Sequence, residues 1–194
     1  MSSTDQKIIE LSKTKILLGI LGSLVFAVAG VWLLTLDADL IETSDNFRLF
    51  FNNPAVAYGL GFAAIVVFGI LALFLFRKLF NKEPGLILNK SGIVDNASAA
   101  SAGFIPWSEV LGSEVFEMQK QKMLVIMVSD PEKYVQRGSA IKQKLNKANY
   151  NMVGSPITIS ATTLKTNFAE LCSVFDEYHR KYGNEPPKLA QRTE

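Results

Sequence analysis

The sequence of 194 residues predicts an α+β protein, in which a two-helix transmembrane hairpin is followed by a small soluble domain. Two long apolar runs, residues 16–36 and 55–76, contain no Asp, Glu, Lys, Arg or His. Between residues 86 and 160, short apolar segments alternate with turn-forming residues, which is typical of β-strands. Large apolar side chains then recur every three or four residues, the spacing of one face of an amphipathic helix: Leu164, Phe168, Leu171, Phe175, Tyr178 and Tyr182.

The two apolar runs have the length of membrane spans. A helix over residues 16–36 reaches roughly 30 Å, the thickness of the hydrocarbon core of a bilayer. A core helix of a soluble protein rarely stays apolar on every face over this length. A cleaved signal peptide is the alternative, because Ala27-Val28-Ala29 resembles a cleavage site. The run continues apolar to Leu34, however, whereas a signal peptide normally turns polar near its cleavage site.

Charges beside the two runs predict their orientation. The loop over residues 37–53 has one basic residue, Arg48, whereas the outer flanks carry Lys7, Lys13, Lys15, Arg77, Lys78 and Lys82. Basic residues stay on the cytoplasmic side, so we expect a multi-pass membrane protein with both termini in the cytoplasm. The single cysteine, Cys172, permits no intramolecular disulfide, which fits a reducing compartment.

Small residues recur along both runs at the spacing of helix packing. The pattern comprises Gly19, Ser23, Ala27 and Gly30 in the first run, and Gly59 and Ala63 in the second. Such residues let helix backbones approach closely in lipid. They indicate either packing within the hairpin or a docking face for another membrane protein or a second copy. Since neither run contains Asp, Glu, Lys, Arg or His, a proton or ion path through this chain is disfavoured.

The chain therefore divides into an N-terminal tail with the hairpin (1–82), a soluble domain (83–183) and a disordered tail (184–194). In the domain we expect strands around the turn 89–92, an edge position at Pro106, and a hairpin over 110–128. Leu124–Val128 is apolar on both faces, so both faces should be covered. We further expect one or two short helices in 131–150, a strand at 156–160, and a final helix capped by Thr162 or Thr163.

Several segments resemble a known group of proteins. Residues 105–110, Ile-Pro-Trp-Ser-Glu-Val, resemble the "apolar-x-Trp-x-acidic-apolar" start of a strand in bacterial pleckstrin-homology-like (PH-like) domains. Residues 83–98 and 144–160 are similar to an uncharacterised family of small bacterial membrane proteins. The resemblance covers most of residues 10–183. It implies a protein of the bacterial inner membrane, with two N-terminal transmembrane helices. It also implies a cytoplasmic PH-like β-barrel or sheet followed by a C-terminal amphipathic helix. The helices before Ile157 depart from a minimal PH-like fold, and the family's motifs imply no known chemistry.

Motifs of catalysis and metal binding are missing from the sequence, which contains neither a nucleophile elbow nor a P-loop, zinc-protease or C-x-x-C motif. Cys172 fits the core side of the last helix. His179 fits the last turn of that helix, where a cation opposes the dipole. One histidine and one cysteine do not make a structural zinc site. We therefore expect neither an enzyme nor a cofactor.

One interval of the chain is strongly basic. No acidic residue lies between Glu132 and Glu170, where Lys133, Arg137, Lys142, Lys144, Lys147 and Lys165 occur. The interval is either a solvated helix face or a surface for anionic lipid headgroups or an acidic partner. Nucleic acid is not expected, because the net charge is only +2 and no aromatic platform accompanies the lysines.

These features favour a non-catalytic, membrane-anchored interaction module, whose partners are the lipid bilayer, anionic headgroups, and a membrane protein or a second copy. One alternative is a subunit of a larger membrane complex or an immunity-type protein against a membrane-active toxin. Another is an enzyme of lipid metabolism, which requires a polar pocket with convergent titratable groups.

Overall fold

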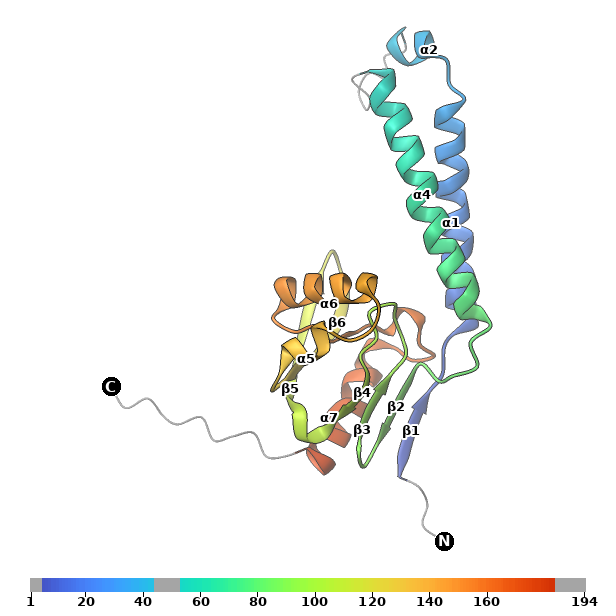
Figure 1. Cartoon of the computed structure of the whole chain (residues 1–194). Helices are drawn as coiled ribbons and strands as arrows, with labels where there is room; N and C mark the ends of the chain where they lie inside the picture. The colour runs from blue at the N-terminus through green and yellow to red at the C-terminus, as the bar shows by residue number, and fades with distance from the viewer. Residues whose placement is uncertain (1–4, 44–52, 184–194) are drawn as a thin grey trace, which may run out of the picture. The chain divides into compact units, whose positions relative to one another are not determined.

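The computed structural model describes residues 5–43 and 53–183, which form two compact units (Figure 1). One unit is Lys13–Lys82, the hairpin. The other, the soluble unit, joins the residues before Lys13 to those after Lys82. Residues 1–12 were predicted to belong with the hairpin, whereas the described part of that segment, residues 5–12, belongs to the soluble unit. The predicted disordered tail 184–194, and Arg48 of the loop, lie outside the described residues.

The hairpin unit consists of α1 (Lys13–Leu34), the short α2 (Ala38–Thr43) and α4 (Pro54–Leu79). Both long helices are long and apolar enough to cross a membrane. Large side chains on both are exposed, among them Leu18 (63%), Phe62 (66%) and Ile70 (64%). A soluble monomer rarely exposes so large an apolar surface. The two predicted helices are therefore present, and they are candidates for membrane spans.

The α1–α4 interface is closest at two glycines. A Cβ atom on Gly30 would lie 2.7 Å from the carbonyl oxygen of Gly61, and one on Gly61 would lie 2.8 Å from that of Gly30. No other residue type allows the backbones to approach so closely. Phe26 and Phe68 stack at 4.6 Å between ring centroids. Small and aromatic residues together therefore set how the helices pack.

The soluble unit contains two antiparallel sheets. The first has the order β1-β2-β3-β4 and the second the order β5-β6-β7. Among the described residues the two sheets remain separate and do not close into a barrel. The strands are β1 (Gln6–Ile9), β2 (Leu86–Asn89), β3 (Gly92–Asp95), β4 (Gly103–Pro106), β5 (Val110–Met118), β6 (Gln121–Val128) and β7 (Thr158–Ile159).

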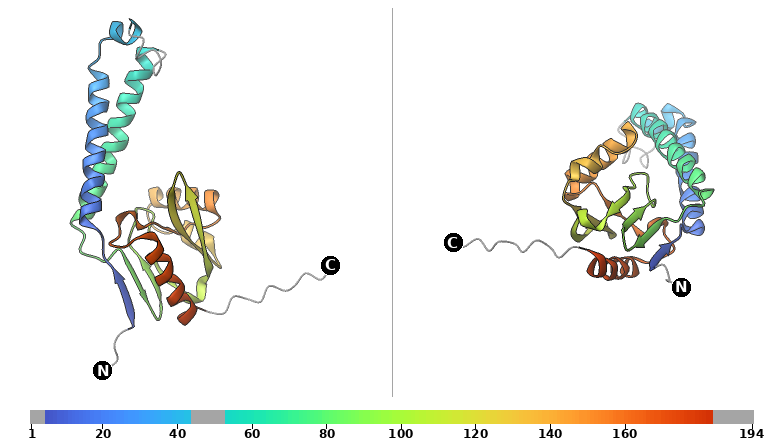
Figure 2. Two further views of the ribbon diagram at one scale, coloured as in Figure 1. Left: turned by 180° about the vertical axis from the view of Figure 1, so that it is seen from behind. Right: turned by 60° about the horizontal axis from the view of Figure 1, so that its bottom comes forward.

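Helices complete this unit. The 3₁₀ turn η1 (Trp107–Glu109) leads into β5, and α5 (Pro131–Val135) and α6 (Ala140–Val153) lie between β6 and β7. After η2 (Ala161–Thr163), the chain ends in α7 (Phe168–Tyr182), which contacts both β2 and β6 (Figure 2). The α+β class, the two short helices and the final amphipathic helix agree with the sequence prediction.

Several local predictions are confirmed. The side chain of Asn89 accepts hydrogen bonds from the Ser91 and Gly92 amides, which forms the predicted turn. Pro106 lies in β4, an edge strand. In β6, the central strand of its sheet, Leu124 and Val125 are both buried although they point to opposite faces.

The start of the last helix was predicted wrongly. Asn167 caps α7 by accepting a hydrogen bond from the Glu170 amide at 2.9 Å. Thr162 instead lies in η2, where its amide donates to the Ser160 hydroxyl at 3.2 Å. Thr163 donates to the Ala97 carbonyl at 2.9 Å. The hydroxyls of both threonines thus belong to the turn that precedes the helix.

Strand β1 was not predicted. It precedes the hairpin in the chain and pairs with β2, which follows the hairpin, with Ile9 opposite Leu86. Beyond the strand, Leu11 bridges to Leu164, and the Ser12 amide donates to the Thr163 carbonyl at 2.8 Å. Ile9 and Leu11 are buried. The N-terminal segment is therefore an integral part of the soluble unit.

Candidate interaction surface

The structure does not gather the six predicted basic residues into one cluster. Lys133 donates to Glu109 at 2.6 Å, and Lys147 lies 3.8 Å from Glu132. Lys165 donates to Glu10 at 2.5 Å, which ties the N-terminal segment to the residues before α7. These three ammonium groups are therefore paired with carboxylates of the soluble unit.

Arg137 belongs to a polar cluster with Glu109 and Tyr134. Its guanidinium lies 4.0 Å from the centroid of the Tyr134 ring and donates to the carbonyls of Ala102 and Phe104 at 3.1 and 2.8 Å. Glu109 accepts from Tyr134 at 2.8 Å as well as from Lys133. This cluster connects α5 to the loop before β4 and to the start of β5.

Electrostatics in this cluster stabilise its observed charge states. The hydrogen bond from Lys133, and then that from Tyr134, lowers the pKa of Glu109 below its usual value. Burial, followed by the hydrogen bond to Glu109, raises the pKa of the Tyr134 phenol. Glu109 therefore remains a carboxylate and Tyr134 a neutral donor at neutral pH. Trp107, the other notable residue of the 105–110 pattern, is buried and donates to the Asn89 carbonyl at 2.8 Å. The pattern thus supports the fold.

Lys142 and Lys144 differ from the other four. Within the described residues, neither side chain forms an ion pair or a hydrogen bond. Both belong to α6, which is capped by Ser139 at its start and by Gly154 (φ 76°) at its end. Beside them runs a row of exposed apolar residues, which we call the α6 stripe: Ile141, Leu145, Ala148 and Met152. The sequence does not indicate that this stripe is exposed, because its spacing is that of an ordinary core-facing helix.

The predicted helix-packing residues divide between two faces of the hairpin. Ser23 is buried and Ala27 half-buried, and a Cβ atom on Gly19 would lie 3.0 Å from Leu75 of α4, so the first row faces α4 as Gly30 does. In contrast, Gly59 and Ala63 are exposed on α4. The contacting face of α4 contains Ala57, Gly61 and Ala72 instead. Spacing alone did not distinguish the row at 57 and 61 from the row at 59 and 63.

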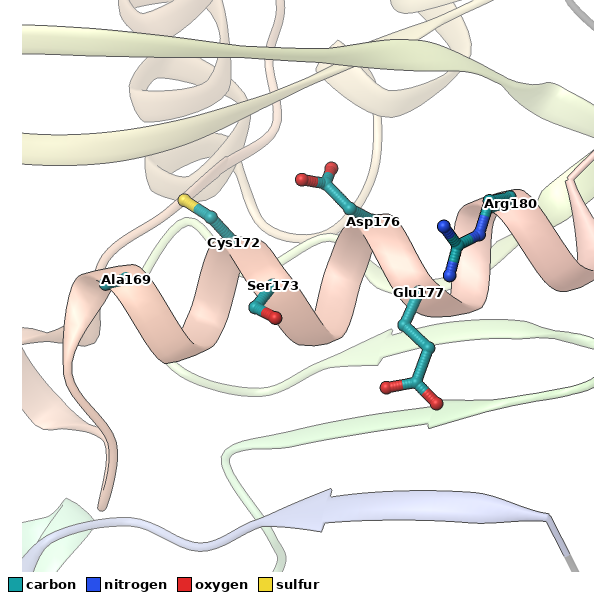
Figure 3. A pocket seen from close by; sticks show the side chains of 6 residues that line it. All are labelled: Ala169, Cys172, Ser173, Asp176, Glu177 and Arg180. Atoms are coloured by element: carbon teal, nitrogen blue, oxygen red, sulfur yellow. The ribbon is translucent and has the colours of Figure 1, made fainter.

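A surface hollow lies along α7 (Figure 3). Its lining residues all belong to that helix: Ala169, Cys172, Ser173, Asp176, Glu177 and Arg180. Cys172, expected in the core, is half-buried. Burial and then the nearby Asp176 carboxylate raise the pKa of its thiol, so it stays protonated at neutral pH and is a poor nucleophile. His179 packs against the rings of Trp107 and Phe175 at centroid distances of 5.8 and 5.5 Å.

A second polar cluster joins the two ends of the soluble unit. Asp5 accepts hydrogen bonds from Tyr178, at 3.1 Å, and from Lys181 and Tyr182 of α7. The bonds from Lys181 and then Tyr182 lower the pKa of Asp5 to about 2. No sequence signal could indicate this cluster, because its members lie at opposite ends of the chain. Across the described part of the chain, no group of three or more His, Cys, Asp or Glu residues is placed to hold a metal ion.

Comparisons of the chain with protein-family models, with curated proteins and with solved structures gave no match. The functional argument therefore depends on the chain's own residues.

Proposed function

We propose that this protein is a non-catalytic interaction module anchored in the bacterial inner membrane. In this proposal α1 and α4 span the bilayer, and the soluble unit lies at its cytoplasmic face. The observation that carries the proposal is the pairing of β1 with β2. Because the strands flank the hairpin in the chain, both ends of the hairpin return to one folded unit, which requires an even number of membrane crossings. The basic flanks of the hairpin favour the cytoplasmic side.

We further propose that the soluble unit is PH-like. The order of elements supports this assignment. An antiparallel sheet of four strands is followed by one of three strands, and then by a helix that contacts both sheets. In such a domain the hairpin would occupy the connection between the first two strands, and α5 and α6 would be an insertion before the last strand. The exposed surface of α6, rather than a pocket, would then be available for a partner.

Cysteine accessibility tests the anchoring and the orientation. In a Cys172→Ser background, Glu42→Cys places a thiol in α2 between the two spans, and Lys90→Cys places one in the β2–β3 turn. Both positions are exposed. We expect a membrane-impermeant maleimide to label position 42 in intact spheroplasts, and position 90 only after lysis. Extraction of the protein by alkaline carbonate, or labelling of position 90 from outside, would contradict the proposal.

A second candidate function is supported by a separate observation. Gly59 and Ala63 lie on the exposed side of α4, where a Cβ atom on Gly59 meets no atom within 4 Å. They are therefore available to another membrane helix, as a subunit of a larger complex would require.

This candidate has its own test. We expect Gly59→Leu with Ala63→Leu to abolish a crosslinked complex in native membranes, with the hairpin intact. Gly22→Leu is the matched control, because a Cβ atom at Gly22 also meets open space. An unchanged crosslinking pattern would remove the candidate. Neither an immunity-type role nor a lipid-metabolising enzyme gains support from the described residues, since the hollow on α7 is lined by a single helix.

A further inference from the structure

The α6 stripe is an apolar face on a well-fixed helix. Positions 141, 145, 148 and 152 are separated by four, three and four residues, so they lie on one face. Ile141 is 73% exposed, Leu145 40% and Met152 45%. The opposite side of α6 is anchored, because Asn146 is 2% exposed and donates to the Tyr134 carbonyl at 2.9 Å. The stripe is therefore exposed on an ordered helix.

The two lysines without an ion pair among the described residues border the stripe. Since successive residues turn by about 100° around a helix, Lys144 and Lys142 project on opposite sides of the line through Ile141 and Leu145. Lys147 projects to the anchored side, where it pairs with Glu132. No acidic residue occurs in α6. An apolar centre between two cations is the pattern of a helix that lies in the interface of an anionic membrane.

The stripe also lies at the end of the soluble unit where the chain connects to the hairpin. Figures 1 and 2 show α6 at the end of this unit where β1 finishes and β2 begins. At this end the chain leaves Ile9 for α1 through residues 10–12, and returns from α4 to Leu86 through residues 80–85. The β2–β3 turn, with Lys90, lies at the other end of β2. The chain therefore leaves for the hairpin, and returns from it, at the end of the soluble unit that includes α6.

From these observations we infer that α6 is an interfacial helix, with its stripe inserted into the anionic bilayer surface and Lys142 and Lys144 at the level of the lipid phosphates. This inference rests on the proposed function, because the hairpin must hold the unit at the membrane. Each lysine close to an anionic surface favours the bound state by about fivefold. Neutralising both should therefore weaken the contact by about 25-fold.

The test uses the full chain in vesicles of phosphatidylcholine, with or without phosphatidylglycerol. In a Cys172→Ser background, Leu145→Cys carries an environment-sensitive fluorophore, and lipids spin-labelled near the headgroup act as quenchers. We expect strong quenching and a blue shift in anionic vesicles, and weaker effects in neutral ones. The same fluorophore on Lys90→Cys should remain in water in both.

Matched charge variants sharpen the test. Lys142→Gln with Lys144→Gln should reduce the quenching at position 145 in anionic vesicles. Lys90→Gln with Arg180→Gln removes the same charge from exposed positions away from α6 and should leave the quenching unchanged. Near-ultraviolet circular dichroism, to which the buried Trp107 contributes, verifies that each variant is folded.

The outcomes separate the two proposals. If the protein resists insertion and carbonate releases it from the vesicles, the proposed function fails. If it inserts and the probe at position 145 remains in water in both lipid mixtures, this inference alone is overturned. Protection of the probe that is independent of lipid charge and increases with protein density would assign the stripe to a second copy, and would also overturn the inference.

Discussion

Helices α6 and α7 have the same kind of amphipathic pattern, but only α7 buries its apolar face. Leu171, Phe175 and Tyr178 of α7 are buried, with Phe175 5.9 Å from Trp107 between ring centroids. On α6, Ile141 and Leu145 are exposed. Periodicity in a sequence thus indicates that a helix has an apolar face, but not what covers that face. In this protein, what covers each apolar face depends on contacts between residues that are far apart in the chain.

Among the changes that test this comparison, deletion of residues 1–12 should have the largest effect on the stability of the soluble unit. The deletion removes β1 and the two buried side chains Ile9 and Leu11, each of which contributes about 1.5–3 kcal/mol. It also exposes the edge of β2. We expect the soluble unit to lose cooperative unfolding, measured by circular dichroism.

A linked variant is the control for this deletion. Residues 1–12 joined by a flexible linker directly to residues 83–194 should restore the cooperative transition, because β1 can again pair with β2. A domain of residues 83–194 that unfolds as cooperatively as the linked variant would show that β1 is dispensable.

Truncation of one apolar side chain on each helix compares them directly. Phe175→Ala in α7 leaves a cavity and should lower the free energy of unfolding by about 3–5 kcal/mol. Leu145→Ala in α6 should change it in detergent by less than about 0.5 kcal/mol, because that side chain is 40% exposed and outside the core. Chemical denaturation monitored by Trp107 fluorescence, in a Trp32→Phe background, measures both. Equal losses would show that the stripe is covered within the chain.

The anchored side of α6 predicts an intermediate effect. Asn146→Ala removes one of two donors to the buried Tyr134 carbonyl, which also accepts from the Arg137 amide at 3.3 Å, and the loss should cost about 0.5–1.5 kcal/mol. Hydrogen exchange should increase in α6 more than in α7. Asn151→Ala, at an exposed position of α6, is the control with a smaller expected change. An Asn146 variant with unchanged exchange would mean that this hydrogen bond does not hold α6 in place.

The smallest expected effect is the acid response of the Asp5 cluster. The pKa of Asp5 is lowered from 3.8 to about 2 by Lys181 and then Tyr182. A carboxyl with a lowered folded pKa stabilises the fold above its unfolded pKa, and this stabilisation disappears as the pH falls from about 3.8 to about 2. Hydrogen exchange of the last turn of α7 should increase over this window. Asp5→Asn should remove this pH dependence, and an unchanged response in that variant would assign it to other carboxyls.

Local patterns predicted much of this fold. The uncharged runs, the turn at Asn89, the doubly buried β6 and the face of α7 all follow from spacing within a few residues. Strand β1 could not be predicted, because its four residues form a strand by pairing with β2, which follows the hairpin in the chain.

The candidate surface was predicted only in part. The basic interval was recognised, but its division into lysines with and without carboxylate partners depends on Glu10 and Glu109, which precede the interval in the chain. The exposure of Gly59 and of the α6 stripe likewise depends on how the helices pack, which the spacing of residues does not reveal.

The most direct test of the central claim is a disulfide across β1 and β2 in native membranes. Ile8 and Ile87 are opposite one another in the antiparallel register, at a separation that suits a disulfide. With Cys172→Ser, we predict that mild oxidation of Ile8→Cys with Ile87→Cys gives a fast-migrating monomer on a gel. Ile8→Cys with Phe104→Cys, on the far edge strand β4, should not. Two reactive but uncrosslinked thiols at 8 and 87 would contradict the claim that one unit holds both ends of the hairpin.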